Sequence, residues 1–309
     1  MIRLKPRSMR NTRSFVVRTS VVLGVFLLVS NAAFVAAQAV KLPSDLMRTA
    51  IGGTQFMQNT DWYLALRTSA VIPSFGIAII VFVVLALGHF FIFGAKDMSI
   101  RDDSDAIPWW SVTERVLHAI LAVAFVVLFI SGLMITFGRF LGGGSATLVM
   151  RLGHEYSGFV FTPIMVILAL MWVRHGLFHK YDGQWFVKAG GYLGYEGKLV
   201  SGKFNAGQKI WYWFMVVFGI LLAWSGFFLY FQLGGMDDMR FYQLLHFAAA
   251  VPIILMFVVH LYMTTIGVKG AFMGMINGRF SKTAAQNYHP EAPALKSGAQ
   301  PAPEPAGSD

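Results

Sequence analysis

The stretch that decides the fold is residues 241–268, FYQLLHFAAAVPIILMFVVHLYMTTIGV, which contains no Asp, Glu, Lys or Arg. A helix of about 20 apolar residues crosses the ~30 Å hydrocarbon layer of a membrane, so this run is long enough to span it. The run also holds two histidines, His246 and His260. Ionisable side chains are costly inside a membrane and usually serve a function there. The stretch therefore predicts a membrane-spanning helix with two functional histidines.

Four more apolar runs indicate that most of the chain is built in the same way. Of its 309 residues, 56% are hydrophobic and only 13% are charged, about half the charged share of a soluble domain. Only helices and closed barrels satisfy the backbone in lipid, and runs this continuous lack the alternation of barrel strands. We therefore expect an all-α membrane protein. The other runs are Ser69–Ala95, Ala119–Gly138 and Ile210–Met236, which are free of charge, and His154–Val173, in which Glu155 is the one charged residue.

The expected membrane helices lie at about 69–95, 116–138, 154–176, 209–232 and 241–267. Basic residues concentrate in the cytoplasmic loops of membrane proteins. In this chain they concentrate after the third and fifth helices, whereas the opposite loops hold few, so the C-terminus is expected on the cytoplasmic side. The net charge of +10 is attributed to this bias rather than to nucleic-acid binding. The basic residues after the third and fifth helices are Lys180, Lys188, Lys198, Lys203, Lys269, Arg279 and Lys282.

The two ends of the chain differ from this core. Residues 1–39 combine a basic start, an apolar run and an Ala37-Gln38-Ala39 triplet, as in a signal peptide cut after Ala39, and an uncleaved anchor helix is the alternative. Either places 40–68 outside the cell as a periplasmic segment. Residues 290–309, rich in Pro, Ala and Gly, are expected to form a disordered cytoplasmic tail. The absence of cysteine excludes disulfides, thiolate-bound clusters and covalently attached haem.

Four histidines are expected to form two pairs at two depths in the membrane. His246 and His260 are fourteen residues apart, which is ~21 Å of depth on nearly one face of a helix. His154 is expected at the outer start of the third helix, level with His246, and His118 near the inner end of the second, level with His260. Imidazole holds b-type haem iron. The depths therefore predict two haems b, whereas a single buried histidine would be interpreted as a structural residue.

The other candidate residues near these pairs have weaker assignments. His175 and His179 are expected at the inner end of the third helix, with His175 the substitute ligand if His118 fails. His89 and His289 are expected to be structural or solvated. Arg115 and Arg151 precede two ligands by three residues and either pair with haem propionates or anchor the helices at the interface. The pairs Ser131-Gly132 and Ser225-Gly226 are interpreted as close-packing sites, or as space for a flat macrocycle.

A polar segment, Lys203-Phe204-Asn205-Ala206-Gly207-Gln208-Lys209, precedes the fourth helix on the inner face. Asn205 is a suitable N-cap. The free backbone N–H groups, the close approach that Gly207 permits and the amide of Asn205 also suit a quinone carbonyl.

Several motifs in order resemble the gamma subunit of respiratory formate dehydrogenase, a cytochrome b556. They are KFNAGQK, LLHFAAA with its histidine fourteen residues before that of VVHLYM, and GVKGAFMGMINGRFS, together with RVLHAI and RLGHEYSG. The resemblance covers about residues 109–289 and implies a four-helix dihaem cytochrome b core, with helix 69–95 as an addition for which the sequence suggests no function.

The resemblance also implies the partners and the binding sites. It implies an inner-membrane subunit with two haems b, an iron–sulfur beta subunit, and an alpha subunit that holds molybdenum or tungsten and oxidises formate. Electrons then pass to menaquinone or ubiquinone at a site that includes Asn205, Gly207 and, more weakly, Gln208. The alternatives are the cytochrome b of a nickel–iron hydrogenase or thiosulfate reductase, a transporter with a histidine proton relay, and a haem-free anchor.

Overall fold

The computed structural model describes residues 72–138, 141 and 144–296. Within these residues, five helices are long and apolar enough to cross a membrane, which confirms the expected class of fold. The proposed leader at 1–39, the segment 40–68 and the end of the tail at 297–309 lie outside the described residues. The spanning helices are α4 (Ile72–Phe93), α5 (Val112–Thr136), α6 (Gly144–Gly176), α8 (Ala206–Phe231) and α9 (Met236–Tyr262), which a π-helical turn, Met263–Gly267, continues.

Two of these helices begin where local capping stops the chain from fraying. Ser111 and Glu114 form a capping box at the start of α5, in which each side chain accepts a hydrogen bond from the other residue's backbone N–H. Asn205 and Gln208 form the same arrangement at the start of α8. Such boxes satisfy two of the four backbone donors that a helix start leaves free. The predicted N-cap at Asn205 is therefore confirmed.

The third membrane helix is longer than predicted. It begins at Gly144, ten residues before His154, whereas we expected His154 to open it. The prediction was wrong because absence of charge locates the part of a helix that lies in hydrocarbon, while the helix itself continues beyond it. His154 thus lies inside α6, as His246 lies ten residues inside α9.

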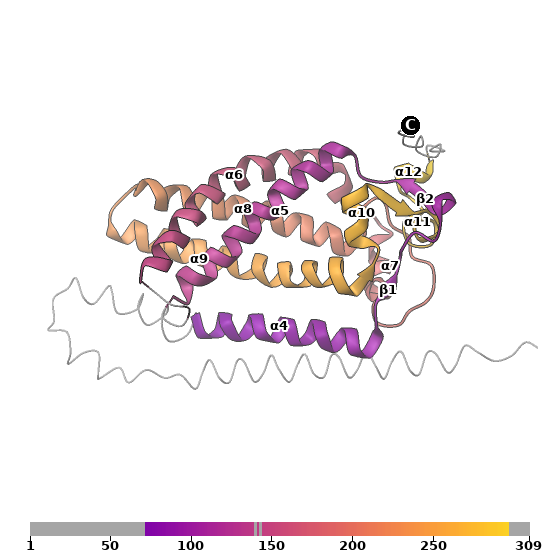
Figure 1. Cartoon of the computed structure of the whole chain (residues 1–309), viewed down its shortest axis with the longest axis horizontal. Helices are drawn as coiled ribbons and strands as arrows, with labels where there is room; N and C mark the ends of the chain where they lie inside the picture. The colour runs from indigo at the N-terminus through magenta and orange to yellow at the C-terminus, as the bar shows by residue number, and fades with distance from the viewer. Residues whose placement is uncertain (1–71, 139–140, 142–143, 297–309) are drawn as a thin grey trace, which may run out of the picture.

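The helices pack in sequential pairs, α5 with α6 and α8 with α9, and α6 joins the pairs by packing on α8. Helix α4 runs along α9 on one side of the bundle (Figure 1). The core at mid-bundle is apolar and aromatic, and on α9 it lies between His246 and His260. Its buried members are Phe75, Ala124, Phe125, Phe161, Met165, Ile253 and Ile254.

Short elements cover one end of the bundle, the end at which α5 and α8 begin (Figure 1). Two small sheets tie this cap together: β1 pairs in parallel with β3, and β2 pairs with β4 in antiparallel register. Buried Asp105 accepts hydrogen bonds from Ser281 Oγ (2.7 Å) and the Thr283 backbone N–H (2.8 Å). The cap comprises β1 (Lys96–Asp97), β2 (Ala106–Pro108), α7 (Asp182–Val187), β3 (Val268–Lys269), α10 (Ala271–Asn277), β4 (Arg279–Ser281), α11 (Lys282–Tyr288) and α12 (Pro293–Lys296).

The beginning of the expected disordered tail is packed onto this cap. Ala292 is fully buried, and the backbone N–H of Glu291 donates to Ser201 O. His289, which we expected to be structural or solvated, is 4% exposed and donates from Nδ1 to Gly202 O at 2.8 Å. The prediction of disorder from residue 290 was wrong for this part of the tail. Alanine is common both in flexible tails and at buried packing positions, so composition alone does not separate the two.

Acidification is expected to loosen this C-terminal packing. Burial lowers the pKa of His289 to about 4, against the opposing effect of its hydrogen bond to Gly202. The folded imidazole is therefore neutral, and its contribution to stability is present above pH ~6.5 and lost as the pH falls toward 4, by about 3 kcal/mol in all. Limited proteolysis of residues 282–296 between pH 7 and 4.5 measures this loss. His289→Gln should flatten that pH dependence, and an unchanged dependence would exclude His289 as its source.

Candidate functional site

The bundle brings the four spanning histidines together in two pairs, one at each depth. His154 on α6 and His246 on α9 have ring centroids 6.1 Å apart. His118 on α5 and His260 on α9 have ring centroids 6.5 Å apart. These are the pairs that depth alone predicted.

The spacing within each pair suits two ligands on opposite sides of one metal ion. Two imidazoles with metal–nitrogen distances of about 2 Å have ring centroids roughly 6 Å apart. Within the described residues, no three His, Cys, Asp or Glu side chains lie close enough to share a metal ion. A pair of imidazoles therefore needs a metal that brings its remaining ligands with it, as the iron of haem does. The donor set of both pairs suits haem b.

The outer pair is held by two serines on the neighbouring helices. Ser131 Oγ on α5 lies 2.9 Å from His154 Nδ1, and Ser225 Oγ on α8 lies 3.0 Å from His246 Nδ1. Both serines are fully buried. The sequence pattern indicated close packing at these positions, but not that each serine contacts a histidine of another helix.

The glycine after each serine makes room for the imidazole. A Cβ at Gly132 would lie 3.4 Å from His154 Cε1, and a Cβ at Gly226 would lie 3.4 Å from His246 Cε1. This separation is ordinary van der Waals contact for a single Cβ, so larger side chains at either position would reach the ring. The Ser-Gly pair thus supplies a hydrogen-bonding oxygen and a flat surface beside each outer histidine.

The inner pair has aromatic neighbours instead. The Trp211 ring stacks on His260, with centroids 4.8 Å apart and planes 17° apart, and the Trp172 ring lies 6.2 Å from His118. The described part of the chain contains no hydrogen-bond partner for the ring nitrogens of His118 or His260. The two depths therefore surround their imidazoles with different chemistry.

The remaining histidines lie away from both pairs. His175 faces Phe204, with ring centroids 5.8 Å apart, so the structure does not need it as a substitute for His118. His89 on α4 has Nε2 2.8 Å from Tyr192 O and Nδ1 2.5 Å from Tyr262 Oη. The hydrogen bond between His89 and Tyr262 links α4 to the last residue of α9, two residues after His260. This link suggests a structural function for α4.

The two arginines differ in their surroundings. Arg151 forms an ion pair with Glu155 one turn along α6, at 2.9 Å. Arg115 Nη1 donates to Ile276 O in α10, and its Nε is buried without a partner in the described residues. Arg115 is thus fixed at the capped end of the bundle, and propionate pairing stays a prediction for both residues.

The start of α8 combines the predicted quinone residues with a tryptophan that the sequence did not single out. Asn205 Oδ1 and Gln208 Oε1 are engaged in the capping box, at 3.0 and 2.9 Å, which leaves their amide N–H groups as donors. A Cβ at Gly207 would lie 2.8 Å from Trp185 Cη2 and 3.3 Å from Asn205 Oδ1. Trp185 therefore covers Gly207 and forms a wall beside the amide of Asn205.

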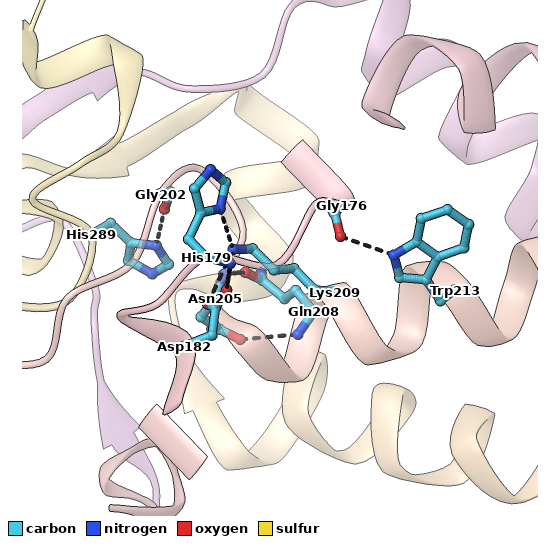
Figure 2. A network of polar contacts seen from close by, with 9 residues as sticks. All are labelled: Gly176, His179, Asp182, Gly202, Asn205, Gln208, Lys209, Trp213 and His289. Carbon is cyan, nitrogen blue, oxygen red and sulfur yellow. Dashed lines mark hydrogen bonds and ion pairs between the residues drawn. The ribbon is translucent and has the colours of Figure 1, made fainter. Parts of the chain in front are cut away.

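A buried ion pair between Lys209 and Asp182 (Figure 2) fixes the short helix that carries Trp185. Lys209 Nζ on α8 lies 2.7 and 3.0 Å from the carboxylate oxygens of Asp182, the first residue of α7, and both side chains are at most 2% exposed. The His179 backbone N–H donates to the same carboxylate at 2.6 Å. Breaking such a pair leaves an uncompensated buried charge, at a cost of roughly 3–5 kcal/mol. The pair fixes α7, and with it Trp185, against the first turn of α8.

Comparison with known proteins agrees with this architecture. Residues 109–278 match the prokaryotic cytochrome b561 family. The chain is 28% identical over 193 residues to the formate dehydrogenase cytochrome b556(fdo) subunit of Escherichia coli K12, covering 60% of this chain and 91% of that protein. It is 30% identical over 188 residues to the nitrate-inducible formate dehydrogenase cytochrome b556(Fdn) subunit of the same strain, covering 57% and 85%.

A third relative is the formate dehydrogenase cytochrome b556 subunit of Haemophilus influenzae, 28% identical over 194 residues, with 57% of this chain and 77% of that protein covered. The matched region contains all four paired histidines and the start of α8, and it excludes α4. The family match spans more than half of the chain, and the described residues contain five helices that are long and apolar enough to cross a membrane. The chain therefore belongs to the prokaryotic cytochrome b561 family.

Proposed function

We propose that this chain is the membrane cytochrome b subunit of a formate dehydrogenase complex and that it passes electrons through two haems b to a quinone. The observation that carries the proposal is the presence of two histidine pairs at two depths, each with a ring spacing that would suit two imidazoles on one haem iron. When bound, haem supplies the one-electron chemistry, while the protein holds, orients and tunes it.

The four histidines have separate functions in this proposal. His154 and His246 hold the outer haem, which faces the electron-donating partner, and His118 and His260 hold the inner haem. The names of the relatives support formate dehydrogenase. By the same argument the partners are an iron–sulfur subunit and a molybdenum or tungsten subunit on the periplasmic side, with the C-terminus of this chain in the cytoplasm.

The quinone site in this proposal is the first turn of α8. The amide N–H groups of Asn205 and Gln208 are free to donate to a quinone carbonyl, and Trp185 provides an aromatic wall. This turn lies at the end of the bundle where His118 and His260 pair, so the quinone is next to the inner haem. Menaquinone and ubiquinone both have the carbonyl that this site recognises.

The haem content of the purified chain tests the core of the proposal. A pyridine haemochrome assay is expected to give close to two non-covalent haems per polypeptide, with a b-type reduced-minus-oxidised spectrum. One haem, or none, would contradict the dihaem assignment, and a colourless protein would favour the proton-relay transporter or the haem-free anchor.

A second measurement separates formate dehydrogenase from the hydrogenase and thiosulfate reductase alternatives. Membranes that contain the intact complex are supplied with formate, hydrogen or thiosulfate in turn. Formate alone is expected to reduce the haems. Reduction by hydrogen, with none by formate, would assign the chain to a nickel–iron hydrogenase.

A further inference from the structure

The two Ser-Gly pairs form matching arrangements on different helices. Ser131 on α5 contacts His154 on α6, and Ser225 on α8 contacts His246 on α9. Each serine hydroxyl also donates to the carbonyl four residues before it, Val127 O at 2.5 Å and Leu221 O at 2.6 Å. The outer pair is therefore supported in the same way from both sides of the bundle.

These contacts determine which ring nitrogen carries the proton. A serine hydroxyl has one hydrogen, and here that hydrogen is directed to the helix backbone, so Oγ is left to accept from the imidazole. Each hydroxyl also lies 3.2 Å from a second backbone carbonyl, Leu128 O for Ser131 and Leu222 O for Ser225, and a carbonyl can only accept. In this arrangement Oγ accepts from Nδ1–H of each outer histidine, which would leave the lone pair of Nε2 available to bind a metal.

The inner pair has no equivalent. Trp211 stacks on His260 and Trp172 lies beside His118, and neither imidazole has a hydrogen-bond acceptor within the described residues. An imidazole whose N–H is hydrogen-bonded is a more basic ligand. A more basic ligand favours the oxidised, more positive form of iron and so lowers its reduction potential.

We propose that Ser131 and Ser225 are positioning residues that hold the outer haem at a lower reduction potential than the inner haem. The inference rests on the proposed function, because it needs haems at both histidine pairs. Each serine accepts a hydrogen bond from one histidine that would hold the outer haem, and within the described residues His118 and His260 have no such bond. With haem bound at both pairs, this difference in potential would favour electron flow from the outer pair toward the inner pair.

The test is a potentiometric titration of both haems in Ser131→Ala, Ser225→Ala and the double variant of the intact complex. Each single change is expected to raise the ratio of reduced to oxidised outer haem at a fixed ambient potential by about threefold, which is ~30 mV at 59 mV per tenfold. The double change should raise it about tenfold, or ~59 mV. The inner haem should keep its potential. The outer component is identified as the one that His154→Ala removes.

The control is Thr162→Val on α6. Thr162 Oγ1 donates to the backbone at Gly158 O, 2.9 Å away, as the serines do to theirs, and it contacts no histidine in the described residues. This change should leave both potentials in place. Ser131→Cys and Ser225→Cys keep the side-chain size with a weaker acceptor, and they should shift the outer haem in the same direction if the alanine variants lose haem.

The outcomes separate this inference from the proposed function. Two haems in the wild type with unchanged outer potentials in the serine variants would overturn the tuning by Ser131 and Ser225 and leave the dihaem assignment intact. An equal shift of both haems would also overturn it, since that is a general loosening of the bundle. A wild type without an outer haem would contradict the proposed function itself.

Discussion

Replacing His260 by alanine is expected to remove the inner haem and leave the outer haem in place. His118→Ala should do the same, because both rings belong to the pair at the inner depth, 6.5 Å apart. His154→Ala and His246→Ala should remove the outer haem instead. Each change takes away one of two axial ligands, so the haem content of the purified chain should fall from about two to about one per polypeptide. Low-temperature spectra identify the component that is lost.

His175→Ala provides the matched control. His175 lies near the inner end of α6 and contacts Phe204 rather than either pair, so this variant should retain both haems. Loss of the same spectral component in His118→Ala and His154→Ala would contradict the pairing. Loss of a haem in His175→Ala would make His175 a ligand and exclude His118 from that function.

Replacing Gly207 by leucine is expected to slow the reoxidation of the haems by quinone at least tenfold. A Cβ at this position already lies 2.8 Å from Trp185 Cη2 and 3.3 Å from Asn205 Oδ1. The longer side chain must displace the tryptophan wall and cover the amide, and misplacement of a binding group by ~1 Å can cost about a hundredfold in rate. Both haems should remain, since residue 207 contacts no paired histidine. Stopped-flow reoxidation, normalised to haem content, measures the effect after reduction by formate.

Gly183→Leu is the control for a large side chain on the same cap. Gly183 lies in α7, and a Cβ there has no heavy atom within 4 Å, so reoxidation should keep its wild-type rate.

Asn205→Ala tests whether Asn205 binds quinone or serves only as the N-cap of α8. Loss of the N-cap costs ~1 kcal/mol of stability in either case. Reoxidation per intact haem should fall if Asn205 binds quinone. Wild-type rates in both Gly207→Leu and Asn205→Ala would place the quinone elsewhere.

Part of the candidate site could be predicted because depth along a membrane helix depends on the sequence alone. A helix rises 1.5 Å per residue, so the fourteen residues between His246 and His260 determine their separation before any packing is known. The depths of His154 and His118 follow from their distances to the ends of their own apolar runs. These depths were sufficient to pair His154 with His246 and His118 with His260. The estimated depth of His154 stayed correct although α6 begins ten residues earlier than predicted. The reason is that the apolar run, and not the end of the helix, sets the depth in the membrane.

The surroundings of the site could not be predicted in this way. The repeated Ser-Gly pairs indicated close packing, but the sequence did not show that Ser131 contacts His154, which lies 23 residues later on another helix. Trp185 gave no signal, because it reaches Gly207 from α7, whose position depends on the ion pair between Asp182 and Lys209. For His289 the sequence left a structural and a solvated position open, and the structure shows that its ring is enclosed by the cap.

The sequence by itself determined the membrane helices, the depths of the four histidines and the cap at Asn205. Each of these depends on interactions within one segment: lipid selects continuous apolar helices, the helix rise sets depth, and a cap satisfies the N–H groups beside it. Only the tertiary structure decided which imidazole nitrogen of His154 and His246 contacts a serine, what covers Gly207 and how the chain around His289 is packed. These features depend on contacts between helices and loops far apart in the sequence. The free energy of such contacts depends on how the side chains pack, which cannot be read from the spacing of residues within one segment.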